Sequence, residues 1–477
     1  MTPVEPLVVE CGPVDKVFRA FQPDQLLLVP PSLDEWLPQE HLARFIADLV
    51  DEHLDLSGFY AGYNEGRGGP PFDPRLMVRV LLLGYTTGIR SSRKLEAACW
   101  DIVAFRWLAG GQAPAYRAIA KFRKRHLSAL GHVFVQALEL CQAAGMLSLG
   151  RVALDGTRVR ANASRRKAMS YARMSEKQKI LAEEVSALLA EAEQIDHDED
   201  AEFGKDNKGY GLPAELARRE SRLAKITEAK AALEAQAKEQ AAAEAQQRAK
   251  AAGKDGDTVA ARAATAGARA VPKPAAQRNF TDPESRIMKT ADGSFHQCFN
   301  AQAVVDEDHQ VIVATDLNSC AADSQTLVPM TEQISANTAL VPTQLLADAG
   351  YCSQANLEAA AAITTECGTQ FLIATGRLEH DEPARATPSG RIPKDFTLKQ
   401  RMARKLRTKP GQAAYARRKA IVEPVFGQIA TLQGKHVLLR GLDNARQEWR
   451  LLAACHNLRK LHSHLGVAGL GTLQPAT

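Results

Sequence analysis

The stretch that decides the fold is "RVALDGTRVRANASRRK", residues 151–167. In it an apolar segment leads into Asp155, which is followed by a glycine and then by a run of arginine and lysine. A carboxylate with apolar neighbours carries a heavy desolvation cost unless it has a partner. Asp155 therefore requires a compensating group, and basic side chains or a metal ion are the obvious choices.

Two further isolated acids, Asp348 in "LLADAGY" and Glu423 in "RRKAIVEPVFG", raise the same question because each stands among apolar residues. Each acid also has a purely structural explanation. Asp-Gly is a turn signal, Asp348 could cap a following helix, and Glu423 before Pro424 fits a first helical turn. Jointly these explanations are less persuasive, because the two aspartates end strands that would lie side by side. The carboxyl ends of parallel strands are where α/β sheets place their sites.

The bulk composition is that of a soluble globular protein. The chain has 477 residues, 45% of them hydrophobic and 24% charged, with a formal net charge of +5 that does not by itself indicate a polyanionic partner. The eight cysteines form no C-x-x-C pair, which argues against a zinc site or a disulfide framework. The sequence opens without a signal-peptide pattern, and no apolar run is long enough to cross a bilayer. We therefore expect a cytoplasmic protein with no membrane partner.

Residues 1–147 are predicted to form an all-α domain with a helix-turn-helix-like arrangement. Apolar residues recur at helical spacing in 41–54, in 74–100 with a turn at 86–90, and in 114–127. Ser91 is placed to cap the helix that follows the turn. Arginines and lysines at i, i+4 and i+8 form one outward stripe. That stripe consists of Arg117, Lys121 and Arg125, and it neighbours Arg90, Arg93 and Lys94.

A basic stripe on a helix is usually no more than a solvated face. The clustering of two basic sets in a helix-turn-helix-like region favours contact with nucleic acid over that explanation. We therefore predict that residues 1–147 form a DNA-binding domain.

Five segments alternate or run apolar over strand lengths and predict a mixed five-stranded sheet. An acidic turn at 306–309 separates the second from the third and predicts an antiparallel hairpin. Residues 319–340 and 353–366 fit helices or crossovers, so the fold class is α/β with flanking helices. The five predicted strands are 151–156, 298–307, 310–318, 343–351 and 369–376.

Between the first and second strands lies a long insertion, 169–279. Two narrow apolar seams predict two helices that pack as an antiparallel hairpin. The segment 253–274, rich in Ala and Gly, reads as a flexible linker. Residues 148–168 and 280–466 are then expected to form one sheet-containing domain that is discontinuous in sequence. The seam residues are Leu181, Val185, Leu188, Ala192 and Ile195 in the first helix and Leu216, Leu223, Ile226 and Leu233 in the second.

The order strand-Asp, long gap, strand-Asp, helix-Glu resembles the DDE-type transposases of bacterial insertion sequences. The motifs "ALDGTRVRANAS", "LLADAGYCS" and "RRKAIVEPVFGQI" carry the likeness in the sheet region, and "FDPRLMVRVLLLGYTTGIRSSRKLEAAC" carries it in the N-terminal region. The resemblance spans roughly residues 20–465. It implies an RNase H-like catalytic domain with an N-terminal helical domain and a helical insert. It also implies a catalytic, metal-binding triad of Asp155, Asp348 and Glu423.

The resemblance further implies the reaction and its partners. Two Mg²⁺ ions, for which Mn²⁺ can substitute, would serve cleavage of the element's terminal inverted repeats and strand transfer into target DNA. The chain would act on double-stranded DNA in the bacterial nucleoid as a homodimer or a higher oligomer. Ala430 stands where the family's lysine would follow Glu423. DNA contacts are expected from Tyr415, Arg418 and Lys419, and phosphate neutralisation from Arg158, Arg160, Arg165, Arg166, Lys167, Lys399, Arg401, Arg404, Lys405 and Arg417.

Two alternatives stay open at this point. The chain could be a non-catalytic DNA-binding remnant of a transposase, or a nuclease of the same fold that only hydrolyses. Cleavage with Mg²⁺ or Mn²⁺ separates the first alternative from an enzyme, and strand-transfer products separate the second.

Overall fold

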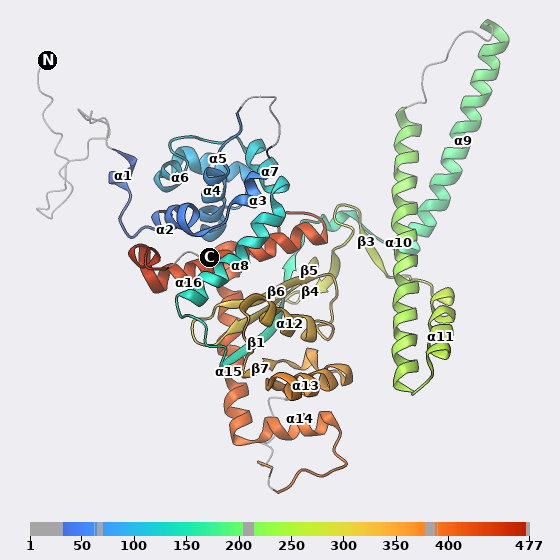
Figure 1. The fold of residues 1–477 in the computed structure, drawn as a ribbon. Coiled ribbons are helices and arrows are strands. Elements are labelled where there is room, and N and C mark those ends of the chain that lie inside the picture. Colours follow the sequence, from blue (N-terminus) through green and yellow to red (C-terminus); the bar gives the residue numbers. More distant parts are fainter. Residues whose placement is uncertain are drawn as a thin grey trace, which may run out of the picture.

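The computed structural model describes residues 32–61, 63, 70–203, 214–376, 387–388 and 390–473. Figure 1 shows three parts: a cluster of helices, a sheet with helices around it, and a long helical projection. The first 31 residues of the predicted N-terminal domain and the polar loop 204–213 of the insert lie outside the described residues. No helix of the described part is long and apolar enough to cross a membrane.

Every described element between Leu33 and Ala143 is a helix, as the sequence predicted. Helix α4 is the centre of this cluster because apolar residues surround almost its whole circumference, and it ends at Gly88, which has a φ of 86°. A Cβ at Gly88 would lie 2.3 Å from the carbonyl oxygen of Leu432, so only glycine fits there. The helices are α1 (Leu33–Trp36), α2 (Leu42–Asp48), the π-helical turn η1 (Leu49–His53), α3 (Ser57–Tyr60), α4 (Pro74–Thr87), α5 (Ser92–Asp101), α6 (Val103–Leu108), α7 (Tyr116–Arg125) and α8 (Leu127–Ala143).

Two local predictions in this cluster need correction. Ser91 does occupy the N-cap of α5, but its side chain makes no capping hydrogen bond. Arg90, predicted to belong to the basic surface, is buried, with its Nη1 3.5 Å from Oε1 of Glu448. Glu448 also accepts the hydroxyl of Tyr85 through Oε1 and the backbone N–H groups of Leu438 and Leu439 through Oε2. A buried charge of this kind serves the packing of helices rather than contact with DNA.

The central sheet is mixed, and all five predicted strands are present. Strand β5 pairs antiparallel with both β1 and β6, which confirms the predicted hairpin, and β1, β7 and β8 are parallel neighbours. Among the described residues the sheet has six strands. The prediction of five missed β4, a short strand whose sequence "RIMK" shows no period-two alternation. The strands are β1 (Arg151–Arg160), β4 (Arg286–Lys289), β5 (Phe295–Asp306), β6 (Ile312–Asn318), β7 (Gln344–Ala347) and β8 (Gln370–Ile373).

One continuous cluster of buried apolar side chains joins the N-terminal helices to the sheet. Helix α16 forms the connection, because it packs against both α8 and β6 and buries Trp449 completely (Figure 1). The elements after β6 are α12 (Leu327–Thr338), the 3-10 turn η3 (Ala349–Tyr351), α13 (Gln354–Cys367), α14 (Leu398–Arg407), α15 (Lys409–Gln428), the π-helical turn η4 (Ile429–Gln433) and α16 (Leu442–Leu470).

The insert is a helical projection with its own small core, as Figure 1 shows. Helices α9 (Tyr171–Phe203) and α10 (Ala214–Ala251) pack along the predicted seam, where Leu181, Ile226 and Leu233 are buried. At the base of the projection, β2 (Ala168–Ser170) pairs antiparallel with β3 (Gln277–Asn279).

The predicted flexible linker is instead a third helix of the projection. Helix α11 (Gly256–Arg269) is capped by Asp255, whose side chain accepts a hydrogen bond from the backbone N–H of Thr258. A Cβ at Gly267 would lie 3.2 Å from the carbonyl oxygen of Lys238, so the backbones of α11 and α10 approach closely. The small residues that resembled a linker therefore serve close helix packing.

A buried histidine in α16 makes the stability of the fold depend on pH. Nε2 of His456 lies 3.0 Å from the carbonyl oxygen of Gln310, and burial lowers the pKa of His456 to about 4. In the unfolded chain this histidine takes up its proton near pH 6.5. The unfolded state therefore binds more protons below pH 6.5, and the stability due to neutral His456 is lost as the pH falls.

We expect the free energy of unfolding to fall by about 1 kcal/mol between pH 7 and pH 5.5 because of His456 alone. Urea unfolding at the two pH values measures the change, and His456→Gln is expected to flatten it. An equal pH dependence in the variant would show that other groups cause the loss.

Candidate active site

Asp155 lies on β1 at the point where the parallel pairing of that strand ends. Its neighbour Leu154 pairs with Ala347, the last residue of β7, whereas β1 itself continues to Arg160 along its antiparallel partner β5. The prediction that Asp155 ends a strand was therefore correct only for the parallel side. The side chain is 19% exposed, and its Oδ2 lies 2.8 Å from Nη1 of Arg418.

Asp348 follows Ala347 directly, so the two aspartates come next to each other at one edge of the parallel strands. Oδ1 of Asp348 accepts the backbone N–H of Gly350 at 2.8 Å, which means that Asp348 also caps the turn η3. Burial raises the pKa of Asp155, the guanidinium of Arg418 opposes this effect, and the negative charge of Asp348 raises the pKa further. The adjacency predicted from the sequence is thus present, and the two carboxylates repel each other.

Helix α15 closes the site with Arg418 and Tyr415. Arg418 is buried, and its guanidinium carbon lies 6.0 Å from the centre of the Tyr415 ring. Burial raises the pKa of Tyr415, and the nearby charges of Arg418 and the two aspartates act on it as well. Both residues were predicted to contact DNA. In the structure Arg418 forms an ion pair with Asp155, and Tyr415 lies near enough to both aspartates to feel their charges. The ion pair competes with any phosphate for Arg418.

Glu423 is not brought to the two aspartates. It is exposed on α15, five residues after Arg418, whereas its neighbours Ile421 and Val422 are buried. At 3.6 residues per turn, five residues place it on a different face of the helix from Arg418. The structural alternative of a first helical turn does not apply to Glu423 either, because α15 begins at Lys409.

The acids as placed do not form a complete metal centre. Within the described ranges, no group of three or more His, Cys, Asp or Glu side chains is arranged to hold a metal ion. The structure thus assembles two of the three predicted acids, Asp155 and Asp348.

The sequence reasoning missed Asp323, which lies in the loop between β6 and α12. Its Oδ1 accepts Nδ2 of Asn300 at 2.7 Å and Nε2 of Gln302 at 2.8 Å, and it lies 3.5 Å from Nη1 of Arg158. Asn300 and Gln302 are buried polar residues two apart on the apolar strand β5. That pair was the available signal, because buried amides require hydrogen-bond partners.

The predicted DNA-contacting residues of the N-terminal helices share one exposed surface. Arg93 and Arg117 lie 5.1 and 5.8 Å from the centre of the Tyr116 ring, and Arg125 lies 4.6 Å from that of Tyr63. Such stacking holds guanidinium groups in place at little cost to their hydration. We call this set the α5–α7 basic surface, and its members Arg93, Lys94, Arg117, Lys121 and Arg125 are all exposed.

The basic residues near the sheet are placed less uniformly. Arg158 is half-buried and donates to the carbonyl oxygen of Ala321 at 2.6 Å, whereas Arg160 is exposed and 3.0 Å from Asp292. Lys419 is exposed on α15.

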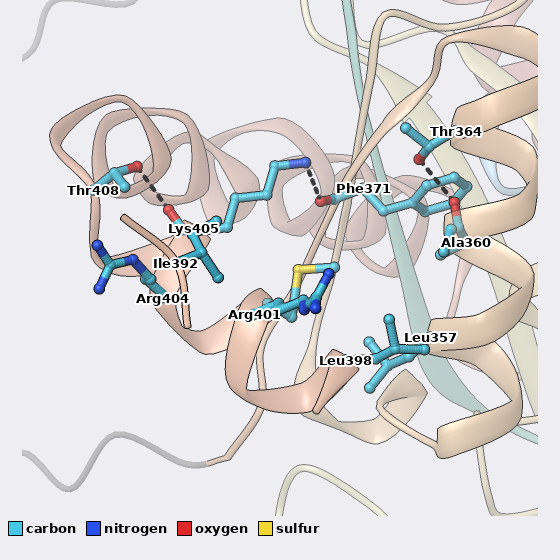
Figure 2. A pocket seen from close by; sticks show the side chains of 12 residues that line it. Leu357, Ala360, Thr364, Phe371, Ile392, Leu398, Arg401, Arg404, Lys405 and Thr408 are labelled. Atoms are coloured by element: carbon cyan, nitrogen blue, oxygen red, sulfur yellow. Dashed lines mark hydrogen bonds between the residues drawn. The ribbon is translucent and has the colours of Figure 1, made fainter. Parts of the chain in front are cut away.

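A hollow of about 430 Å³ lies between α13, α14 and β8 (Figure 2). Phe371, Leu357 and Leu398 line it, and none of the three predicted acids does. At its edge Lys405 donates to the carbonyl oxygen of Phe371 at 3.1 Å, and burial lowers the pKa of Lys405. The predicted use of Lys405 as a phosphate ligand therefore competes with this internal bond, and the hollow is separate from the carboxylate pair.

Comparison with protein families gives two matches. Residues 31–125 match the transposase domain DUF772, and residues 267–458 match the transposase DDE domain. The first match covers every residue of the α5–α7 basic surface. The second includes Asp348 and Glu423 and begins after Asp155. No curated protein and no solved structure matches the chain.

Proposed function

Because the chain belongs to the DDE-type transposases of insertion sequences, we propose that it cuts DNA at the ends of such an element and joins the cut ends to target DNA. The observation that carries this proposal is the meeting of Asp155 and Asp348 at one strand edge, beneath the basic helix α15. The strand order β6-β5-β1-β7-β8, with β5 antiparallel to its neighbours and β1, β7 and β8 parallel, supports an RNase H-like arrangement of the catalytic domain.

The donor set of this site suits a hard divalent cation. Carboxylate oxygens are the ligands that Mg²⁺ prefers, and two repelling carboxylates are stabilised when a cation lies between them. Two bound divalent ions would activate the attacking hydroxyl and neutralise the charge of the leaving oxygen. Asp155 and Asp348 would hold the cations. Glu423 is assigned as the third ligand only by its position in the motif "VEPVFG", because α15 holds it apart from the two aspartates in this structure.

The side chains around the two carboxylates affect their charge and the approach of DNA even without a bound cation. Arg418 favours the ionised form of Asp155, because its guanidinium opposes the rise that burial causes in the pKa of that carboxyl. Tyr415 packs beside Arg418 and limits where the guanidinium can move. The exposed basic groups Arg160 and Lys419 are placed to neutralise phosphates of a DNA backbone that enters beside the site.

The direct test uses the purified chain and a linear duplex of the DNA that flanks its gene. With Mg²⁺ or Mn²⁺ we expect strand cleavage at a defined end, followed by joining of that end to a supercoiled plasmid. With EDTA, or in a buffer without divalent ions, we expect no cleavage product, while the chain still binds the duplex. Cleavage that is equally fast in EDTA would exclude the proposed chemistry.

The α5–α7 basic surface is proposed to bind the DNA backbone. We expect Arg117→Glu with Lys121→Glu to weaken duplex binding and to lower the slope of log K against log salt by about 1 for each lost phosphate contact. Arg222→Glu with Lys225→Glu, at two exposed basic residues of the insert helix α10, changes the net charge equally; this matched control is expected to leave binding unchanged. Fluorescence anisotropy at several salt concentrations measures both. Equal losses from the two changes would mean that only net charge matters.

One observation favours a second candidate function. Glu423 is apart from the other two acids, which is the state expected of a non-catalytic DNA-binding remnant of a transposase. Such a remnant binds the flanking duplex but leaves it intact with either metal. A nuclease of the same fold would cleave it without joining.

Joining two ends of one element requires two active sites, so the transposase is further proposed to act as a homodimer or a larger assembly.

A further inference from the structure

Asp323 lies on the opposite side of β1 from the carboxylate of Asp155. Successive side chains of a strand point to opposite faces. Asp155 points to the face covered by α15, where it meets Arg418, so Gly156 opens to the other face. On β5, Gln302 pairs with Gly156 and Asn300 pairs with Arg158. The side chains of Gln302, Asn300 and Arg158 all contact Asp323 on that second face.

Two glycines leave the space that Asp323 occupies. A Cβ at Gly156 would lie 3.0 Å from Oδ1 of Asp323 and 2.4 Å from Nε2 of Gln302. A Cβ at Gly350 would lie 3.2 Å from Oδ2 of Asp323 and 3.0 Å from Oδ1 of Asp348. One carboxylate therefore fits against both the residue after Asp155 and the residue two after Asp348. In both motifs, "LDG" and "DAG", the glycine is needed for the same reason: a side chain there would collide with Asp323 or its partner.

Hydrogen bonds extend this contact into a bridge between the two strand ends. Gln302, which donates to Asp323, accepts the hydroxyl of Tyr351 through its Oε1. Tyr351 is fully buried in the turn η3 that Asp348 caps. Thr326 also donates to Gln302, at 3.3 Å, from the start of α12. The bridge thus runs from Arg158 on β1 through Asp323 and Gln302 to Tyr351, which follows Asp348 by three residues.

We propose that Asp323 is a positioning residue that fixes the separation of Asp155 and Asp348 from behind the sheet. This role rests on the proposed function of the two aspartates. Asp323 acts through the bonds that its Oδ1 accepts from Asn300 and Gln302, rather than as a ligand of the cation. The task needs an acceptor oxygen of this shape and does not need a negative charge.

The test compares two substitutions of Asp323 in the full chain. Asp323→Ala removes the acceptor, and we expect about 10- to 100-fold slower cleavage of the flanking duplex and a similar rise in the Mn²⁺ dissociation constant measured by calorimetry without DNA. Asp323→Asn keeps an acceptor oxygen, so it is expected to retain most of the wild-type cleavage rate and most of the wild-type Mn²⁺ affinity. Binding of the duplex is expected to stay within about 2-fold in both variants, because no DNA contact is removed.

A glycine pair supplies an independent check. Gly350→Ala places a methyl group against Asp323 and Asp348 and is expected to weaken Mn²⁺ binding as Asp323→Ala does. Gly376→Ala is the matched control, because a Cβ there meets nothing within 4 Å. Thermal melting of every variant separates a loss of fold from a loss of position, since a merely structural role lowers the melting temperature without changing the Mn²⁺ affinity of the folded fraction.

Two results would overturn the inference. Asp323→Ala with wild-type Mn²⁺ affinity and cleavage would show that nothing is positioned by this residue. Asp323→Asn as inactive as Asp155→Asn would show that its charge is required and that it is a ligand. Either result leaves the proposed function standing. That function fails on different results: no metal-dependent cleavage by the wild-type chain, or normal cleavage by Asp155→Asn.

Discussion

Asp155→Asn is expected to lower metal-dependent cleavage of the flanking duplex by more than about 100-fold, because it removes the charge from the carboxylate at the centre of the site. Binding of the same duplex is expected to change by less than about 2-fold. The substitution keeps the size of the side chain, so Arg418 retains a neighbouring oxygen within reach. Cleavage rates over a Mg²⁺ series, together with gel-shift affinities, measure the two effects separately.

The control for this prediction breaks a comparable ion pair elsewhere in the sheet. Asp316 on β6 lies 2.8 Å from Nε of Arg446 and is partly buried, as Asp155 is. Asp316→Asn is expected to leave cleavage within about 2-fold of wild type, since it only weakens a partly exposed ion pair. If Asp155→Asn cuts as well as Asp316→Asn, the assignment of the aspartate pair is wrong.

Glu448→Ala is expected to cost about 3–5 kcal/mol of unfolding free energy, the largest effect on stability that we predict. The change leaves the Arg90 guanidinium buried without its carboxylate and leaves the N–H groups of Leu438 and Leu439 without an acceptor. Arg90 lies in the turn between α4 and α5, and Glu448 lies on α16. The substitution therefore weakens the contact between the N-terminal helices and α16. Urea unfolding measures it.

Two further variants identify which interaction causes the loss of unfolding free energy. Glu448→Gln keeps an acceptor for the backbone N–H groups and is expected to lose less than Glu448→Ala. Asp443→Ala removes a carboxylate from an exposed ion pair with Arg446 and is expected to change stability little. A Glu448→Ala protein as stable as Asp443→Ala would mean that the buried network contributes nothing to the union of the two parts.

Much of the fold was predictable from periodicity. The five strands, the helices of 74–100 and the seam of Leu181, Ile226 and Leu233 are all present, because burial of one face imposes a repeat that the sequence displays directly. The misses have local reasons. Strand β4 is short and without alternation, and α11 consists of small residues whose packing against α10 cannot be told from a linker in sequence.

By itself, the sequence determined the order of the elements, the family and the adjacency of Asp155 and Asp348. These follow from local patterns and from parallel pairing, whose carboxyl ends share an edge. Only the tertiary structure decided which charges are internal. It placed Arg418 on Asp155, Arg90 on Glu448 and Asp323 behind the two glycines, and it left Glu423 exposed on α15. Such outcomes depend on the relative rotation of helices packed on the sheet, and no spacing within the chain encodes that rotation.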